Sequence, residues 1–371
     1  MAAKAQFSFP TTILFGAGTV GDVAEQLARL NCTRPLVVTD AGLASTPTFG
    51  KAIAALPTSS VFSGVRSNPL DEDVRAAAEV FSRDRCDAVI GLGGGSALDV
   101  AKVLRLSVQF PDWKMSEPLP SDDVGALAPF VAIPTTAGTG SEVGRSSVIT
   151  MGGRKHVIFH PSLLAKLVIL DPELTVDLPA KLTAATGADA LTHCIESFTS
   201  PAFHPMCDGI ALEGIRLIAD ALPRAVKSPH DLDARGKMLI AATMGGVAFQ
   251  KDLGAAHSLA HPLSAICHLH HGLANALVLT TVMQFNAARK PGMYARVATA
   301  LNCRGASDRE TIDTVSKVFD DIGIPGGLAI HGVTESHLDE LADQAFEDGC
   351  HLTNPVPVTR ADLLQLYREA M

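Results

Sequence analysis

Short apolar runs that alternate with segments of helical periodicity fill the first half of the chain. This alternation is typical of a parallel sheet whose strands are joined by crossover helices. A hairpin that turns at Gly152-Gly153 is expected to interrupt this order between Ser147 and Phe159. The expected strands are Thr12–Phe15, Pro35–Thr39, Ser60–Ser63, Ala88–Leu92, Phe130–Ile133 and Leu167–Leu170, and the expected helices lie near Val20–Leu30, Asp71–Arg83 and Ser96–Val108.

After Leu170-Asp171-Pro172 the pattern changes, because strand-like runs become rare and long stretches rich in Ala and Leu have helical period. Asp177, placed before Leu178-Pro179, predicts a helix start with a capping carboxylate and a proline in the first turn. We therefore predict an α/β domain over residues 1–177 and an almost entirely helical domain over residues 178–371. With 371 residues and 47% apolar content, the chain is large enough for two cores.

Composition argues against several classes of protein. A net charge of −9 without any basic run argues against nucleic-acid binding. The seven cysteines are odd in number and lack C-x-x-C spacing, which argues against a disulfide framework and indicates reduced thiols. Residues 1–10 contain no apolar stretch suited to export, and no segment approaches the roughly 18 apolar residues of a membrane span. We expect a soluble cytoplasmic protein with neither nucleic-acid nor membrane partners.

Histidine spacing in the second half predicts a metal site. Asp189 with His193, and His257 with His261, are four residues apart and can each aim two side chains at one point from a helix. His271 follows in a segment, residues 253–288, that contains several histidines and no Lys, Arg, Asp or Glu. Buried imidazoles need partners, and a carboxylate with imidazoles suits zinc or ferrous iron. Among 13 histidines, however, some such pairs arise by chance, so a structural role remains an alternative.

Two glycine motifs compete for a phosphate. Residues 16–21 match G-x-G-x-x-G and precede Asp40 by about twenty residues, as a dinucleotide fingerprint requires. Residues 91–99, Gly-Leu-Gly-Gly-Gly-Ser-Ala-Leu-Asp, place three consecutive glycines at a helix start, and we prefer this turn for a pyrophosphate. Asp40 then suits the ribose hydroxyls and repels a 2′-phosphate, which favours NAD over NADP, although it can instead cap a helix. The polar run at residues 134–142 is expected to line the phosphates or the nicotinamide amide, or to be a flexible turn.

These motifs together resemble the iron-containing (group III) alcohol dehydrogenases over nearly the whole chain. The matching segments are Ile13-Leu14-Phe15-Gly16, Ser67-Asn68-Pro69, Gly93-Gly94-Gly95-Ser96 with Asp99 and Lys102, residues 134–142, Leu170-Asp171-Pro172, residues 187–193 with Glu196, and residues 257–272. The resemblance implies an α/β N-terminal dinucleotide-binding domain and an all-α C-terminal domain, the two-domain architecture also found in dehydroquinate synthase. It further implies hydride transfer between NAD(H) and a small alcohol and its aldehyde or ketone.

Site residues follow from the resemblance by matching positions. It implies Asp189, His193, His257 and His271 as the metal ligands and His261 as a proton-relaying histidine that does not bind the metal. It also implies that the Gly16–Gly21 match is not the pyrophosphate site. The implied contacts to NAD come from Asp40, Asn68, Gly94, Gly95, Ser96, Asp99, Thr135, Thr136, Thr139 and Lys155.

Several alternatives remain open from the sequence. A maleylacetate reductase of the same superfamily departs from this ligand pattern, and a dehydroquinate synthase-like lyase needs basic side chains that residues 253–288 lack. A zinc hydrolase would need an H-E-x-x-H motif, which is missing, and a simple binding module would not need both sites. Phe249, Gln250, Leu253 and Cys267 are expected to line the substrate site or to be core residues. Relatives lead us to expect a homodimer or larger assembly, with iron or zinc bound.

Overall fold

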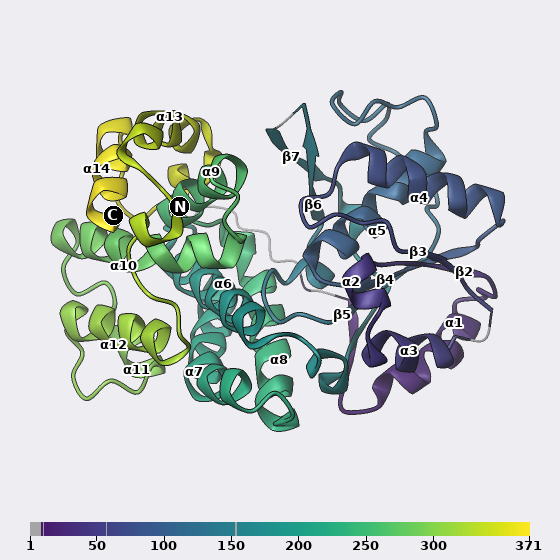
Figure 1. The fold of residues 1–371 in the computed structure, drawn as a ribbon, viewed down its shortest axis with the longest axis horizontal. Coiled ribbons are helices and arrows are strands. Elements are labelled where there is room, and N and C mark those ends of the chain that lie inside the picture. The colour runs from purple at the N-terminus through teal and green to yellow at the C-terminus, as the bar shows by residue number, and fades with distance from the viewer. Residues whose placement is uncertain (1–8, 10, 57, 153) are drawn as a thin grey trace, which may run out of the picture. The chain divides into compact units, whose positions relative to one another are not determined.

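The structure is a computed structural model that describes residues 9, 11–56, 58–152 and 154–371. It divides into an α/β unit, formed by residues 11–136 together with Gly140–Leu178, and a helical unit over Pro179–Met371 with which Phe9 and Ala137–Thr139 also group (Figure 1). The predicted fold class is therefore confirmed. Gly153 and most of the first ten residues, on which two sequence expectations fall, lie outside the described residues.

The α/β unit is built on a six-stranded parallel sheet with the order β1-β8-β5-β4-β2-β3. Strands β1 and β8 have the predicted bounds, and each of the others ends one residue away from its predicted end. All parallel strands end at one edge of the sheet, and the turns that follow β2, β4 and β5 meet there. The strands are β1 (Thr12–Phe15), β2 (Pro35–Val38), β3 (Ser60–Phe62), β4 (Ala88–Gly93), β5 (Phe130–Pro134) and β8 (Leu167–Leu170).

Helices cover both faces of this sheet, as the alternation of side chains along a strand requires. On one face, Val23 and Leu27 share an apolar cluster with Ile90 of β4. On the other face, Gly91 allows α5 to approach closely, because a Cβ there would lie 2.9 Å from Leu98 Cδ2. The helices are α1 (Val23–Arg29), α2 (Ala41–Ala44), α3 (Pro47–Ala54), α4 (Asp71–Arg83) and α5 (Gly95–Gln109), with 3-10 turns η1 (Thr19–Asp22), η2 (Ser141–Val143), η3 (Pro161–Leu163) and η4 (Pro172–Thr175).

The predicted hairpin is present as an antiparallel pair, β6 (Ser146–Met151) and β7 (Arg154–Phe159). Gly152 has a φ of 56°, a left-handed conformation that glycine adopts at no steric cost.

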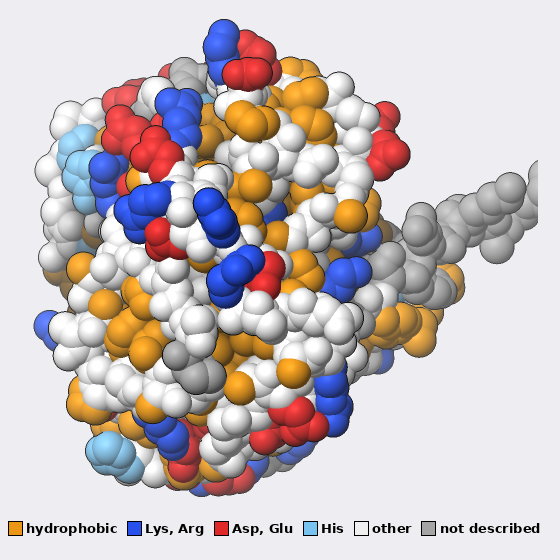
Figure 2. Space-filling model, turned by 90° about the vertical axis from the view of Figure 1, so that its right-hand side faces the viewer, with side chains coloured by type: hydrophobic (Ala, Val, Ile, Leu, Met, Phe, Trp, Pro, Cys, Tyr) orange, Lys and Arg blue, Asp and Glu red, His pale blue; other side chains and the backbone are white. Residues whose placement is uncertain are grey.

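On the face drawn in Figure 2, Lys and Arg side chains are interspersed with Asp and Glu rather than gathered into one basic area.

The second unit is entirely helical within the described residues, as expected from the sequence. None of the described helices is both long and apolar enough to span a membrane. Its helices are α6 (Ala180–Thr199), α7 (Pro205–Lys227), α8 (Leu232–Ala248), α9 (Ala255–Ile266), α10 (His271–Arg289), α11 (Ala295–Ala300), α12 (Asp308–Asp321), α13 (Leu338–Glu347) and α14 (Arg360–Ala370), with 3-10 turns η5 (Phe249–Lys251), η6 (Ala329–His331), η7 (Glu335–His337) and η8 (Gly349–Thr353).

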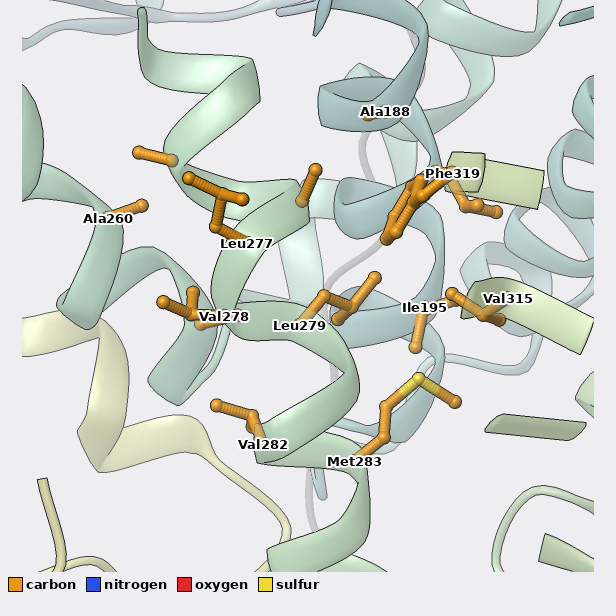
Figure 3. Close-up of a cluster of buried hydrophobic side chains, with 14 of the residues drawn as sticks. Ala188, Ile195, Ala260, Leu277, Val278, Leu279, Val282, Met283, Val315 and Phe319 are labelled. Carbon is orange, nitrogen blue, oxygen red and sulfur yellow. The ribbon is translucent and has the colours of Figure 1, made fainter. Parts of the chain in front are cut away.

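One apolar cluster holds α6, α9 and α10 together. Figure 3 shows Leu279 and Met283 of α10 close to Ile195 of α6 and Val315 of α12. Burial of aliphatic side chains of this size stabilises a fold by roughly 1.5–3 kcal/mol each relative to exposure. The cluster therefore fixes the three helices that carry the predicted metal ligands.

One local prediction is wrong. Asp177 does not cap α6, whose N-cap is Pro179 without a side-chain hydrogen bond. The Asp177 carboxylate instead accepts hydrogen bonds from the backbone N–H of Thr48, at 3.0 Å, and from its hydroxyl, at 2.6 Å. The carboxylate thus bonds a residue 129 positions away in the sequence, and the local sequence cannot predict such a contact.

Candidate active site

Three helices of the helical unit bring the predicted ligands together. Asp189 Oδ1 lies 3.4 Å from His271 Nε2 and 3.8 Å from His257 Nε2. One ligand atom from each of these residues lies within 4.8 Å of the other two, close enough to hold a metal ion. The residues come from α6, α9 and the first turn of α10, so the cluster depends on how the helices pack.

His193 lies beside this cluster, one helical turn after Asp189. Its Nδ1 is 4.0 Å from Asp189 Oδ2, and its ring stacks on that of His257 with centroids 4.6 Å apart. Nδ1 is buried and has no hydrogen-bond partner among the described residues. A buried imidazole nitrogen without a partner costs stability unless something binds its lone pair or proton.

The charge states of Asp189 and His257 suit a divalent cation. Burial opposes ionisation of Asp189, but the neighbouring His193, His271 and His257 and a hydrogen bond from Asn275 lower its pKa to about 2. Burial lowers the pKa of His257 well below its ordinary value. An ionised carboxylate with neutral imidazoles is the form that binds metal, and this donor set fits zinc or ferrous iron.

Glu196 orients the His257 ring through Nδ1, the ring nitrogen that does not face the cluster. Its Oε2 lies 2.5 Å from His257 Nδ1, and its Oε1 accepts a hydrogen bond from Ala256 N at 2.7 Å. Burial raises the pKa of Glu196 to about 7, an effect offset in part by backbone N–H donors. A carboxylate that accepts the Nδ1–H of a ligating histidine fixes its tautomer and leaves Nε2 for the metal.

His261 is held in the same way by Asp348, a residue that sequence reasoning did not single out. His261 Nδ1 lies 2.7 Å from Asp348 Oδ2, while Asp348 Oδ1 accepts hydrogen bonds from Ser258 Oγ and Cys350 N. The His261 ring stacks on that of His271 with centroids 5.3 Å apart, and the side chain is 30% exposed. His261 therefore lies against the cluster and is partly exposed, and its role as a proton carrier stays a prediction.

His261, Asp348 and Cys350 also form a cluster with the spacing of a metal site. Both carboxylate oxygens of Asp348 already accept hydrogen bonds, as described above. Burial, with a contribution from Asp348, raises the pKa of the Cys350 thiol well above its ordinary value. A thiol that stays protonated is a poor ligand, so this cluster fits a metal less well than the first.

In the α/β unit, the triple-glycine turn follows β4 and opens α5, as predicted. Thr135 N donates to Gly93 O at 3.0 Å, and a Cβ at Gly94 would lie 3.5 Å from Thr136 Oγ1. Gly94 is the N-cap of α5, with Gly95 as its first residue, and no side chain caps this end. The free N–H groups of a fifteen-residue helix at the carboxyl edge of a parallel sheet suit a phosphate.

Asp40 lies next to this turn at the end of β2. Its Oδ1 caps α2 by accepting from Leu43 N at 2.9 Å. Its Oδ2 would be 3.8 Å from a Cβ on Gly93, so the carboxylate adjoins the glycine turn. Capping a helix and contacting a ribose are therefore compatible roles for Asp40, because one oxygen caps α2 while the other stays close to the glycine turn.

Of two further predicted residues, Asn68 lies near the same turn and Lys155 lies on the hairpin. Ser96 Oγ donates to Ser67 O at 2.6 Å, which brings the exposed Asn68 close to the start of α5. Thr150 N donates to Pro69 O, and Thr150 pairs with Lys155 across the hairpin. Asn68 and Lys155 thus belong to segments that meet at this end of the hairpin.

Asp99 and Thr139 have other surroundings. The Asp99 carboxylate accepts hydrogen bonds from Ser141 Oγ at 2.6 Å and from Val148 N at 2.9 Å. It thereby ties α5 to the hairpin, and contact with a cofactor stays a prediction. Thr139 belongs to the short segment that groups with the helical unit, where a Cβ on Gly138 would lie 2.9 Å from Thr186 Cβ on α6.

The backbone amides of the first glycine motif already donate to a side chain of the same protein. Asp171 accepts hydrogen bonds from Gly18 N and from Val20 N, each at 3.1 Å. Because the Asp171 carboxylate already accepts hydrogen bonds from these amides, the Gly16–Gly21 turn has a structural role. This agrees with the expectation that the match is not the pyrophosphate site.

The residues expected to line the substrate site differ in their surroundings. Phe249 is 36% exposed, and its ring stacks on that of His193 with centroids 5.9 Å apart. Leu253 is buried and is a core residue. Gln250 Nε2 donates to Val247 O, and Cys267 Sγ lies 3.9 Å from His337 Nδ1. Phe249 therefore lies against a predicted ligand.

Comparison with known proteins matches both halves of the chain to one family. Residues 10–172 match the model for iron-containing alcohol dehydrogenases, and residues 183–371 match the C-terminal model of the Fe-containing alcohol dehydrogenase family. The chain is 37% identical to the 4-hydroxybutyrate dehydrogenase of Cupriavidus necator, over 97% of this chain and 98% of that one. It is 34% identical to the NAD-dependent methanol dehydrogenase of Bacillus methanolicus, over 98% of this chain and 99% of that one.

A solved structure agrees with these relatives. A 1,3-propanediol oxidoreductase superposes with a TM-score of 0.94 and 33% identity, over 99% of this chain and 100% of that one. The agreement covers both units and includes no large unmatched segment. The chain therefore belongs to the iron-containing alcohol dehydrogenase family and is an oxidoreductase of alcohols.

Proposed function

We propose that Asp189, His193, His257 and His271 hold one divalent cation in an NAD-dependent dehydrogenase that acts on a small alcohol and its aldehyde or ketone. The observation that carries the proposal is the approach of one oxygen and two imidazole nitrogens, from three helices, to within 4.8 Å of one another. Nδ1 of His193, which is buried and makes no hydrogen bond within the described part of the chain, supports a fourth ligand at this place. Family membership implies NAD and a divalent metal, and the family description favours iron over zinc.

When bound, a cation held by neutral imidazoles and one carboxylate keeps a net positive charge and lowers the pKa of an alcohol. His261 supports this chemistry, because Nδ1 donates to Asp348 and Nε2 is then a proton acceptor. The buried surroundings of His257 exclude water and so strengthen electrostatic interactions nearby. These residues fit a reaction that releases one proton and one hydride from an alcohol.

We propose that the triple-glycine turn binds the pyrophosphate of NAD and that Asp40 binds the adenosine ribose. The free amides of α5 favour a negative group, and the Asp40 carboxylate disfavours a 2′-phosphate. The proposal extends to Asn68, Thr135, Thr136, Thr139 and Lys155. The NAD-dependent relative from Bacillus methanolicus supports the choice of dinucleotide.

The substrate is proposed from the relatives. Their names give methanol, 1,3-propanediol and 4-hydroxybutyrate, which are all short molecules with a hydroxyl group. Phe249, which stacks on His193, offers an apolar surface for a short carbon chain. Assembly as a homodimer or larger oligomer and a cytoplasmic location also remain proposals.

The test is a turnover assay with defined metal. Metal-free protein is loaded anaerobically with Fe²⁺ or Zn²⁺ and given NAD with methanol, ethanol, 1,3-propanediol or 4-hydroxybutyrate, and the absorbance of reduced nicotinamide is followed. We expect absorbance to rise with at least one alcohol. Protein that retains metal and NAD but shows flat traces with all alcohols, and with the matching aldehydes and NADH, would refute the proposed function.

The ligand set is tested by substitution. His271→Ala is expected to abolish turnover and to lower bound metal, measured by elemental analysis, because Nε2 is one of the converging atoms. His230→Ala, at an exposed position between α7 and α8, is the control and should retain both. Unchanged metal content in His271→Ala would remove this residue from the ligand set.

A further inference from the structure

Asn275 touches every atom of the converging cluster, although it is not among the proposed ligands. It lies on α10 one helical turn after His271 and is fully buried. Its Nδ2 donates to Asp189 Oδ1 at 2.8 Å and lies 3.2 Å from His257 Nε2 and 3.2 Å from His271 Nε2. One side-chain amide thus contacts a proposed ligand atom on each of three helices.

The surroundings determine which end of the amide faces the cluster. Asp189 Oδ1 is an acceptor, and His257 Nε2 carries a lone pair because Nδ1 of the same ring donates to Glu196. An amide oxygen in this place would be repelled by them, whereas the NH₂ group can donate two hydrogen bonds. Asp189 Oδ1 can accept from the amide and still bind a cation through a second lone pair, whereas an imidazole Nε2 has one lone pair and faces either the amide or the cation.

The other end of the amide indicates that Asn275 is not there for stability. Its Oδ1 is buried and accepts no hydrogen bond within the described part of the chain. A buried carbonyl oxygen without a donor destabilises a fold, and an apolar side chain of similar size would avoid this cost. A residue that lowers stability while contacting three functional groups is typical of a site where function determines the side chain.

We infer that Asn275 is a positioning residue for the metal site, one whose amide fixes the Asp189 carboxylate through Oδ1 and keeps His257 Nε2 and His271 Nε2 close together until a cation takes their lone pairs. The inference rests on the proposed function, because it takes these three residues as ligands. Residues that orient ligands without binding the metal typically change metal affinity by about 10–100-fold when replaced. We expect a loss within this range when the amide is removed.

The same helix provides a matched control. Asn286 is also a buried asparagine of α10, but its amide bonds to Asn354, which donates to Asn286 Oδ1 at 2.8 Å. Asn286 Nδ2 in turn donates to Asn354 Oδ1 at 3.3 Å. Replacing it disturbs a buried amide network of similar size without removing a contact to Asp189, His257 or His271.

The experiment measures Zn²⁺ affinity, not turnover. Wild type, Asn275→Leu, Asn275→Ala and Asn286→Leu are freed of metal and titrated with Zn²⁺ against a chromophoric chelator, after circular dichroism has verified folding. Leucine fills the space of the asparagine, whereas alanine leaves it open. Because the two substitutions disturb the packing in different ways, one variant should fold if the other does not. We expect both Asn275 variants to bind Zn²⁺ about 10–100-fold more weakly and Asn286→Leu to bind like wild type.

The outcomes separate this inference from the proposed function. Wild-type affinity in either folded Asn275 variant would overturn the inference while leaving the ligand set intact. An equal loss in Asn275→Leu and Asn286→Leu would also overturn it, because general destabilisation would then explain the effect. A wild-type protein that binds no Zn²⁺ would overturn the ligand set and the inference together.

Discussion

A methyl group at Gly272 is expected to displace a proposed ligand. A Cβ at this position would lie 2.0 Å from Ala185 O on α6 and 3.0 Å from Asp189 Cβ, whereas real Cβ contacts essentially never fall under 3.0 Å. The start of α10 must therefore move away from α6 by about 1 Å in Gly272→Ala, the difference between 3.0 and 2.0 Å. His271 directly precedes Gly272, so this movement separates His271 from Asp189.

The magnitude follows from the tolerance of metal coordination. Metal–ligand distances vary by only about 0.2 Å within one kind of site, so a 1 Å shift removes His271 from the coordination sphere. We expect Zn²⁺ affinity to fall by about 100-fold or more, since replacing even an orienting residue costs about 10–100-fold. Overpacking of this kind also costs about 1–3 kcal/mol, which is roughly 2 to 12 °C in melting temperature for a unit of this size.

The assay combines Zn²⁺ titration with thermal unfolding of the metal-free protein. Gly209→Ala is the control, because a Cβ on Gly209 in α7 meets nothing within 4 Å. The same substitution in an open helical position should leave Zn²⁺ affinity unchanged and raise stability slightly. A Gly272→Ala protein with wild-type Zn²⁺ affinity would refute the link between helix packing and the metal site.

Other predictions concern the α/β unit and the buried thiols. Asp40→Gly should lower the ratio of kcat/KM with NAD to that with NADP by about tenfold or more, and an unchanged ratio would remove Asp40 from the ribose site. Lys102→Met should destabilise the protein by about 3–5 kcal/mol in urea unfolding, because the buried ammonium bonds Ser141 Oγ and Ser146 O beside Asp99; full stability would contradict this. Burial raises the pKa of Cys194 to about 12 and that of Cys207 to about 11, so both thiols should resist iodoacetamide at pH 8 until urea unfolds the chain. Rapid labelling of either in the native protein, detected by peptide mass spectrometry, would show that its burial is wrong.

Features with a local physical cause were predictable from the sequence. The strands were predictable because the period and composition that indicate a strand act within three to six residues, and Asp71–Arg83 was predictable from its helical period alone. The ligand pairs Asp189 with His193 and His257 with His261 were visible because a helix places residues four apart on one face. Asn275 stands in the same relation to His271, so that spacing was an available signal for it.

Features that depend on distant segments were not predictable in this way. Asp348 orients His261 from 87 positions further along the chain, and Asp177 bonds Thr48 across 129 positions. The Gly16–Gly21 match has the spacing of a dinucleotide fingerprint, but Asp171, more than 150 positions away, accepts its amides. In each case a carboxylate meets donors that only the folded chain brings to it, so its role follows from tertiary packing.

The most direct test of the central claim is anomalous diffraction from crystals of the protein loaded with Zn²⁺ or Fe²⁺, collected at the absorption edge of the metal. We predict one strong peak at about 2.0–2.2 Å from Asp189, His193, His257 and His271, the bond lengths that zinc forms with oxygen and nitrogen ligands. A peak beside His261, Asp348 and Cys350 instead, or fully loaded protein without a peak between α6, α9 and α10, would contradict it.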